Sequence, residues 1–236
     1  MIEKTIITSQ QNKYQLTSDN KLVVDWVNDP ENQTETILNQ INNERMYDPI
    51  FQGSASMTVL DLGANIGLFS LYASDSSARI IAVEAVPDTF AVLSELTKDH
   101  DNITKLNLAV GNTNDKITFY LNKNSTTNSL VSHRGRPIEV QGVTIADLIK
   151  QQQLTNVDFV KCDIEGSEMM AITDETIAPV KDIVQFWFVE LHQTDNDTAV
   201  WPGNLESNRQ QLKAIFERNG YTTETVIHDQ LFAWKE

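Results

Sequence analysis

Cysteine is almost absent from this chain of 236 residues, in which Cys162 is the only one. A single thiol cannot form an intrachain disulfide, and such low usage favours a reducing compartment, so we expect a cytoplasmic protein. Long hydrophobic runs are missing as well. No apolar stretch approaches the roughly 20 residues that cross a bilayer, and no basic segment leads into an apolar one at the N-terminus. The sequence thus predicts neither membrane insertion nor an export signal.

Positive charge is scarce too, because 18 lysines and arginines stand against 33 aspartates and glutamates, for a formal net charge of -15. This excess of negative charge repels phosphate backbones, so we expect no nucleic-acid partner. The hydrophobic share of 40% and the charged share of 22% fit one large globular domain or a domain with a small extension. Nothing in the composition indicates an oligomeric state.

Residues 1–56 show no clear periodicity and are predicted to form an N-terminal extension, which is a candidate cover for the active site. Within them, Leu22–Val27 could be a strand and Thr36–Ile41 part of a helix. From residue 57 to residue 236, short apolar runs alternate with helical stretches, a pattern typical of βα units in a mostly parallel sheet. We therefore predict one α/β domain over residues 57–236.

The buried strands of this domain are predicted at Thr58–Leu62, Arg79–Glu84, Ile103–Val110, Val157–Asp163 and Ile183–Leu191. Helices are predicted at Ile66–Ala73, after a cap at Asp88, after a capping box at Thr144–Asp147, and at Asn204–Asn219. Tyr221–Ile227 and Leu231–Trp234 are predicted to form a C-terminal antiparallel hairpin. Such an ending on a parallel sheet is typical of methyltransferases rather than of dehydrogenases.

The run Asp61–Gly67 is the clearest candidate for a ligand-binding loop. A buried strand that turns sharply into a helix needs small residues where the backbone approaches a ligand, and Gly63, Ala64 and Gly67 meet that need. A dinucleotide fingerprint would require G-x-G-x-x-G, but Asn65 stands at its second glycine and the later glycine is out of register. The loop therefore favours a smaller, sulfonium-bearing nucleoside over a pyrophosphate.

Two acidic residues complete this prediction. Glu84 ends the second strand about 20 residues after the glycine turn, where a carboxylate can accept both hydroxyl protons of a ribose. Asp61 lies inside an apolar run, where burial without hydrogen bonds is costly. We expect Asp61 either to hold the amides of the loop or to meet the amino group of the cofactor.

Six segments resemble, in order, the motifs of FkbM-type methyltransferases: Val59–Gly67, Glu84–Pro87, Ala109–Gly111, Asn128–Leu130, Val157–Glu168 and Val189–His192. Cys162 stands where an aliphatic residue is usual. The resemblance spans residues 57 to 234. It implies a Rossmann-like class I methyltransferase fold, with a mostly parallel sheet and helices on both faces, and S-adenosylmethionine as cofactor. It also implies O-methylation of sugars or natural products as a common activity.

With this resemblance, the predicted cofactor site comprises Asp61, Gly63, Ala64, Asn65, Gly67, Leu68, Glu84, Ala85, Ala109 and Asp163. The acceptor is expected beside it, since ligands of open α/β sheets lie at the carboxyl ends of the strands. The polar residues predicted to gather there are Asp163, Glu165, Glu168, Glu190 and His192. We predict Asp163, Glu190 and His192 to be catalytic, with Asp163 or His192 as the general base.

Several alternatives stay open at these positions. Glu165 and Glu168 could instead cap the helix that follows, and His192 could be a plain hydrogen-bonded histidine. Lys161, inside a buried strand, is expected to pair with one of the acids. A divalent metal such as Mg²⁺ is a further possibility, with Asp163, Glu190 and His192 as candidate ligands.

Candidate acceptor contacts are Arg134, Arg136, Glu165 and Trp201. The two arginines belong to the only compact basic patch of the chain, in the polar tract of residues 122–137, which could equally be a solvated loop. Trp201 could stack on a sugar or could pack internally. The leading hypothesis is O-methylation of a small molecule or glycan. The alternatives are methylation of protein or nucleic acid, and a cofactor-binding module without catalysis.

Overall fold

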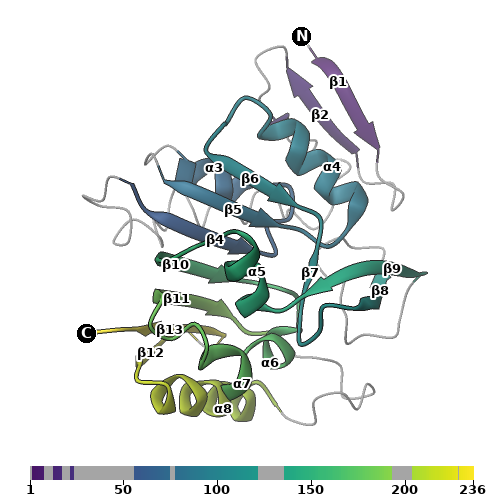
Figure 1. Cartoon of the computed structure of the whole chain (residues 1–236). Helices are drawn as coiled ribbons and strands as arrows, with labels where there is room; N and C mark the ends of the chain where they lie inside the picture. The colour runs from purple at the N-terminus through teal and green to yellow at the C-terminus, as the bar shows by residue number, and fades with distance from the viewer. Residues whose placement is uncertain are drawn as a thin grey trace.

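The computed structural model describes residues 2–7, 13–17, 22–23, 56–74, 78–121, 136–192, 204–227 and 229–236 (Figure 1). In the N-terminal part, three strands form an antiparallel sheet of their own: β1 (Ile2–Ile7), β2 (Lys13–Thr17) and β3 (Leu22–Val23). The strand predicted to reach residue 27 is described only as far as Val23, and the predicted helix at residues 36–41 lies outside the described ranges. A covering role for residues 1–56 stays a prediction.

The main element is a sheet of seven strands in the order β12-β13-β11-β10-β4-β5-β6. Its bounds are β4 (Thr58–Leu62), β5 (Arg79–Val83), β6 (Ile103–Leu106), β10 (Val157–Cys162), β11 (Val184–Glu190), β12 (Thr222–Ile227) and β13 (Gln230–Trp234). The five strands from β11 to β6 are parallel, and β13 pairs antiparallel with both β11 and β12. The predicted class I methyltransferase fold with its C-terminal antiparallel hairpin is confirmed.

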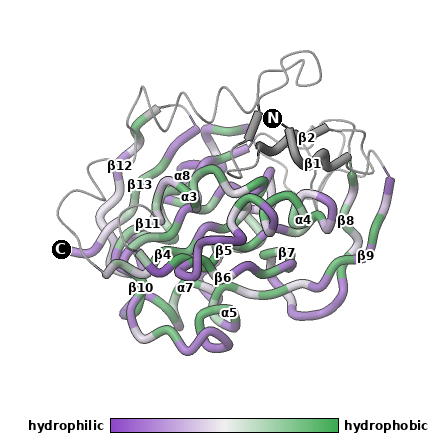
Figure 2. The backbone as a smooth tube through the Cα atoms, turned by 90° about the horizontal axis from the view of Figure 1, so that it is seen from above, coloured by the Kyte–Doolittle hydropathy of each residue, from purple (hydrophilic) through white to green (hydrophobic). Residues whose placement is uncertain are grey.

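Helices cover both faces of this sheet, because alternate residues of each buried strand point to opposite sides. Their bounds are α3 (Leu68–Ser74), α4 (Pro87–Leu96), α5 (Ile145–Gln151), α6 (Glu168–Ala171), α7 (Asp174–Ile177) and α8 (Leu205–Arg218). Val59 packs with residues of α3 and α4, whereas its neighbour Leu60 packs with residues of α5, α7 and α8. Figure 2 shows hydrophobic segments gathered along the strands in the middle.

One predicted strand is wrong in its extent. The strand expected over Ile103–Val110 ends at Leu106, and β7 (Ala109–Val110) belongs to a third sheet with β9 (Arg136–Val143) and β8 (Lys116–Leu121). The chain leaves the large sheet at Asn107, whose side-chain amide donates to the carbonyl oxygens of Glu84 and Ala85. Figure 1 shows this small sheet to the side of the large one.

The predicted helix caps are confirmed at Thr144 but not at Asp88. Thr144 caps α5 by accepting a hydrogen bond from the Asp147 backbone N–H, as predicted, and Asn204 caps α8. The cap predicted at Asp88 is wrong, because α4 begins one residue earlier at Pro87 and Asp88 lies in its first turn. Proline suits that first position, since its fixed φ is helical and its missing N–H would have no partner there.

No helix in the described part of the chain is long and apolar enough to cross a membrane.

Candidate active site

The loop from β4 into α3 is held tightly against β5. The backbone N–H groups of Gly63 and Ala64 both donate to the carbonyl oxygen of Val83, at 3.0 and 2.9 Å. Gly63 has a φ of +79°, and a Cβ there would lie 1.8 Å from the carbonyl oxygen of Asp163. Only glycine fits, because a side chain would be strained and would also collide with backbone. A small residue is therefore required at Gly63, as predicted, because Gly63 packs against the backbone of Asp163.

The rest of the loop shows the same backbone demands. Gly67 has a φ of +92°, and a Cβ there would lie 2.4 Å from Leu93 of α4. Asn65 also has a positive φ, 51°, a conformation that asparagine tolerates better than most residues. Ala64 is buried, and Leu68 is the first residue of α3. The loop is thus shaped as a cofactor-binding turn requires.

Glu84 follows β5 and supports this loop with its carboxylate. Oε2 accepts a hydrogen bond from the Asn65 backbone N–H at 3.0 Å, and Oε1 accepts one from the Val86 N–H at 2.8 Å. The residue is only 8% exposed. Burial raises the pKa of Glu84 to about 7, although the two backbone N–H groups lower it. Each oxygen retains a lone pair for a ribose hydroxyl.

Asp61 does not hold the loop amides, so that one of its two predicted roles is wrong. Its Oδ2 accepts a hydrogen bond from the Ser70 hydroxyl of α3 at 2.6 Å. Its Oδ1 is buried and has no hydrogen-bond partner. Burial raises the pKa of Asp61, while Lys161 beside it on β10 lowers it. A buried oxygen without a donor fits the other predicted role, which is to accept a hydrogen bond from the cofactor's amino group.

These residues fit S-adenosylmethionine in three respects: a loop whose backbone permits close approach, a carboxylate at the end of β5 for the ribose, and an unpartnered acceptor at Asp61 Oδ1. A role of Ala85 and Ala109 in cofactor binding stays a prediction. Ala109 is buried in an apolar cluster with Val86 and residues of β8 and β9, and Ala85 packs against it.

The turn after β10 brings the acidic residues to the glycine loop. The Asp163 backbone N–H donates to the carbonyl oxygen of Leu62 at 3.0 Å, so the two strand ends are joined. Lys161 was predicted to pair with one of the acids. That acid is Asp163, whose Oδ2 lies 2.8 Å from Lys161 Nζ. Burial by itself would raise the pKa of Asp163, but the positive charges of Lys161 and His192 hold it below its ordinary value.

Glu168 ties this turn together instead of only capping the short α6. The carboxylate is 1% exposed, and its Oε1 accepts hydrogen bonds from the backbone N–H groups of Ile164 and Gly166, both at 3.1 Å. Within this turn, Glu165 and Gly166 have positive φ angles of +55° and +91°. The turn therefore folds around the buried carboxylate of Glu168, a role that helix capping alone does not describe.

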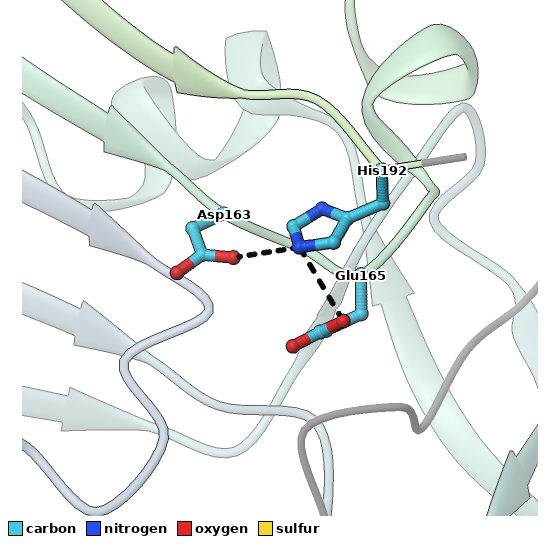
Figure 3. A group of neighbouring side chains, drawn as sticks. All are labelled: Asp163, Glu165 and His192. Carbon is cyan, nitrogen blue, oxygen red and sulfur yellow. Dashed lines mark ion pairs between the residues drawn. The ribbon is translucent and has the colours of Figure 1, made fainter. Parts of the chain in front are cut away.

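His192 lies two residues beyond the end of β11 and completes the cluster (Figure 3). Its Nδ1 lies 3.0 Å from Glu168 Oε1, while its Nε2 lies 3.5 Å from Glu165 Oε2 and 3.7 Å from Asp163 Oδ1. Burial alone would lower the pKa of His192, but the Glu168 hydrogen bond and the charges of Glu168, Asp163 and Glu165 raise it to about 11. The imidazole therefore carries a proton at neutral pH in this arrangement.

Glu190 stands apart from this group. Among the residues that the structure describes, the side chains whose donor atoms converge within 4.8 Å are those of Asp163, Glu165 and His192. Of the predicted candidate ligands, Asp163 and His192 therefore belong to this group, and Glu165 rather than Glu190 is the third member. Burial and the charge of Asp163 raise the pKa of Glu190 to about 7, and burial raises that of Glu165 to about 8. In both residues burial is the larger cause, and neighbouring carboxylates add to it.

Of the predicted acceptor contacts, Glu165 lies in the cluster and Arg136 is exposed at the start of β9. Arg134 and Trp201 lie outside the described residues. Two contributors escaped the sequence analysis: Ser70 as the partner of Asp61, and Asn107 behind Glu84. Glu168 was predicted in this cluster, but its contact with His192 was not. None of these contacts carries a local signal, because each one joins residues from different segments of the fold.

Known proteins were compared with the chain. The family model of the methyltransferase FkbM domain matches residues 61–222. Methyltransferase sdnD of Sordaria araneosa is 25% identical over 230 residues, covering 80% of this chain and 82% of that protein.

Among solved structures, the fibrillarin pre-rRNA processing protein of Methanococcus jannaschii is 12% identical, with a TM-score of 0.48 over 80% of this chain and 69% of that one. Precorrin-6y C5,15-methyltransferase of Geobacter metallireducens is 15% identical, with a TM-score of 0.45 over 81% and 87%. The assignment rests on the family model, which covers more than half of the chain. The chain therefore belongs to the methyltransferase FkbM domain family and is a methyltransferase, for which this family implies S-adenosylmethionine as the methyl donor.

Proposed function

We propose that this methyltransferase transfers the methyl group of S-adenosylmethionine to a hydroxyl oxygen of a small molecule or glycan. The observation that carries the proposal is the contact between the two site segments. Asp163 lies directly after β10, and its carbonyl oxygen fills the space that a side chain at Gly63 would need. A carboxylate is thereby fixed next to the loop expected to hold the donor.

On the donor side, the chain has to bind S-adenosylmethionine and orient its methyl group. When bound, S-adenosylmethionine supplies a methyl group on a positively charged sulfur. Glu84 binds the ribose hydroxyls with the lone pairs left free by Asn65 and Val86. Asp61 offers Oδ1 to the amino group. The negative charge around the strand ends favours a cationic donor over its neutral product.

On the acceptor side, the chain has to align a hydroxyl with the methyl group and receive its proton. We assign the proton to Asp163, whose Oδ1 faces the cluster while Lys161 holds its Oδ2. His192 already carries a proton in this arrangement, so we assign it to orienting the acceptor. The net charge of -15 favours a small molecule or glycan over nucleic acid.

Donor binding tests the first half of the proposal. Calorimetric titration of the full chain with S-adenosylmethionine should show one site, and it should be weakened in Glu84→Gln. Absence of binding at millimolar donor, in protein shown to be folded by circular dichroism, contradicts a donor site, whereas binding without any turnover favours the alternative of a cofactor-binding module without catalysis.

Turnover tests the second half. The chain is incubated with donor and a panel of sugars, glycans and hydroxylated natural products, with RNA and protein substrates alongside, and methylated products are detected by mass spectrometry. We expect Asp163→Asn to keep donor binding and to lose turnover by about 100-fold or more. Asp182→Asn is the matched control, since Asp182 is exposed before the start of β11, at the opposite edge of the sheet. Equal turnover in both variants removes Asp163 as the base, and product from RNA or protein alone contradicts the acceptor class.

A further inference from the structure

Three donor atoms, two carboxylate oxygens and one imidazole nitrogen, converge at the carboxyl end of the sheet. Asp163 Oδ1 and Glu165 Oε2 come from the turn after β10, and His192 Nε2 comes from the segment after β11 (Figure 3). The nitrogen lies 3.7 and 3.5 Å from the two oxygens, and all three atoms lie within 4.8 Å of one another. We infer that Asp163, Glu165 and His192 bind a divalent metal ion of the Mg²⁺ or Mn²⁺ class. The inference rests on the proposed function, because the ion would act on the acceptor hydroxyl.

The orientation of His192 supports a ligand at Nε2. Its other ring nitrogen, Nδ1, is hydrogen-bonded to Glu168 Oε1 at 3.0 Å. Glu168 itself is 1% exposed and is fixed by two backbone N–H groups of the turn. Histidines that bind metals almost always donate their second N–H to a carboxylate, a backbone carbonyl or water, which fixes the tautomer and the plane of the ring. Glu168 is thus a positioning residue that leaves Nε2 facing the two other ligands.

The donor set also indicates which ion. Two carboxylate oxygens and one imidazole suit a hard cation, and three protein ligands leave about three positions of an octahedron for water and acceptor oxygens. A thiolate is not available: Cys162 is fully buried in the core cluster formed with α5, α7 and α8. Lys161 occupies the other oxygen of Asp163, so Oδ1 remains for the ion.

The position of this ion, next to the loop expected to hold the donor, suits the proposed reaction. With one oxygen of Asp163 on the ion and the other paired with Lys161, an acceptor hydroxyl on the ion would lose its proton to water, and more readily than in free solution because the cation stabilises the alkoxide. That oxygen then forms its bond to the methyl carbon as the bond from carbon to the sulfonium sulfur breaks. The products are the methyl ether and the neutral thioether, and the ion is unchanged.

Metal binding is tested directly, without turnover. The full chain is titrated with Mn²⁺, and free ion is followed by electron paramagnetic resonance, with and without S-adenosylmethionine. We expect one bound Mn²⁺ per chain, with affinity at least about tenfold weaker in Glu165→Gln, His192→Ala and Glu168→Gln. Glu139→Gln is the matched control, because Glu139 is an exposed residue of β9. Wild-type affinity in Glu165→Gln, or equal loss in Glu139→Gln, overturns the assignment.

A second measurement covers variants that fold poorly. Pulsed paramagnetic resonance of Mn²⁺ bound to the wild-type chain should show coupling to an imidazole ¹⁴N nucleus. Bound Mn²⁺ without that coupling overturns His192 as a ligand. Folded protein that binds S-adenosylmethionine but no Mn²⁺ in the millimolar range overturns the metal site and leaves the proposed function standing. Protein that binds Mn²⁺ with the coupling but no donor supports the metal site and contradicts the proposed function.

Discussion

Donor binding should depend on pH through Glu84, and one substitution should remove that dependence. Burial raises the pKa of this carboxyl to about 7 in the protein without donor. Ribose hydroxyls donate hydrogen bonds, so they favour the ionised carboxylate over the protonated acid. Binding of S-adenosylmethionine therefore removes a proton from Glu84 wherever that proton is still present. The affinity should fall as the pH falls through 7.

The size of the effect follows from the fraction of ionised Glu84. With a pKa of about 7, roughly nine-tenths of the protein is ionised at pH 8 and roughly one-tenth at pH 6, so the apparent affinity falls about tenfold. Calorimetry at both pH values measures this change. Repeating the titration at pH 6 in two buffers of different ionisation enthalpy counts the released proton. The negative charges of Asp61 and Asp163 also raise this pKa, but less than burial does.

The control is Glu84→Gln, which cannot ionise. Its affinity should be lower at pH 8, because glutamine has one acceptor oxygen for the N–H groups of both Asn65 and Val86. It should also change less than the wild type between pH 8 and pH 6. The amino group of the donor titrates in both proteins alike, so the difference between them isolates Glu84. Wild-type affinity that is equal at the two pH values, or an unchanged pH dependence in the variant, refutes the reasoning.

The same shift affects folding. The pKa of Glu84 is raised in the folded state, from 4.5 to about 7, so the folded state holds this proton more tightly than the unfolded state. Its contribution to stability is complete below pH 4.5 and is lost as the pH rises through 7, by an amount on the order of 3 kcal/mol. Donor bound to the carboxylate should oppose that loss. Comparing urea unfolding of the wild type and Glu84→Gln across this window measures it.

Two substitutions in the loop region should lower the free energy of unfolding, measured by urea titration. Gly63→Ala should cost about 3 kcal/mol or more, because the new Cβ meets the carbonyl oxygen of Asp163 at 1.8 Å and φ is +79°. The control is Gly220→Ala, where φ is +82° but only the flexible tip of a lysine lies nearby, so the cost should be about 1–2 kcal/mol. Equal losses of unfolding free energy in the two variants would contradict the close contact between Gly63 and Asp163. Ser70→Ala should cost about 1–3 kcal/mol, because Asp61 loses its one hydrogen-bond donor, and a neutral result would show that this carboxyl is not buried as described.

The sequence predicted those parts of the site that depend on neighbouring residues. Gly63 and Gly67 were recognisable because a sharp turn from strand to helix demands their backbone conformations, which they have. Glu84 was recognisable because the end of the next parallel strand lies beside that turn. The alternation of apolar runs with helical stretches likewise predicted the parallel strands of the large sheet and its C-terminal hairpin, but not the small sheet of β7, β8 and β9.

The parts that were missed depend on contacts between distant residues. The strand expected to continue past Leu106 breaks because Asn107 donates to carbonyl oxygens 22 and 23 positions earlier in the chain. Glu190 was expected beside His192, since residues two apart share a face of a strand. That rule stops at Glu190, where β11 ends, and His192 turns instead to a carboxylate 24 positions away. No spacing in the sequence shows such a pairing.

The contact between Gly63 and Asp163 also limits how this site can change. The donor loop and the acidic turn touch through backbone, by the carbonyl oxygen of Asp163 over Gly63 and by the hydrogen bond from its N–H to Leu62. A substitution that moves the turn in order to admit a new acceptor therefore also moves the loop and weakens donor binding. Acceptor selectivity has to come from segments that do not share this contact. Arg136, exposed on the separate sheet of β7, β8 and β9, meets that condition, whereas Glu168, inside the turn, does not.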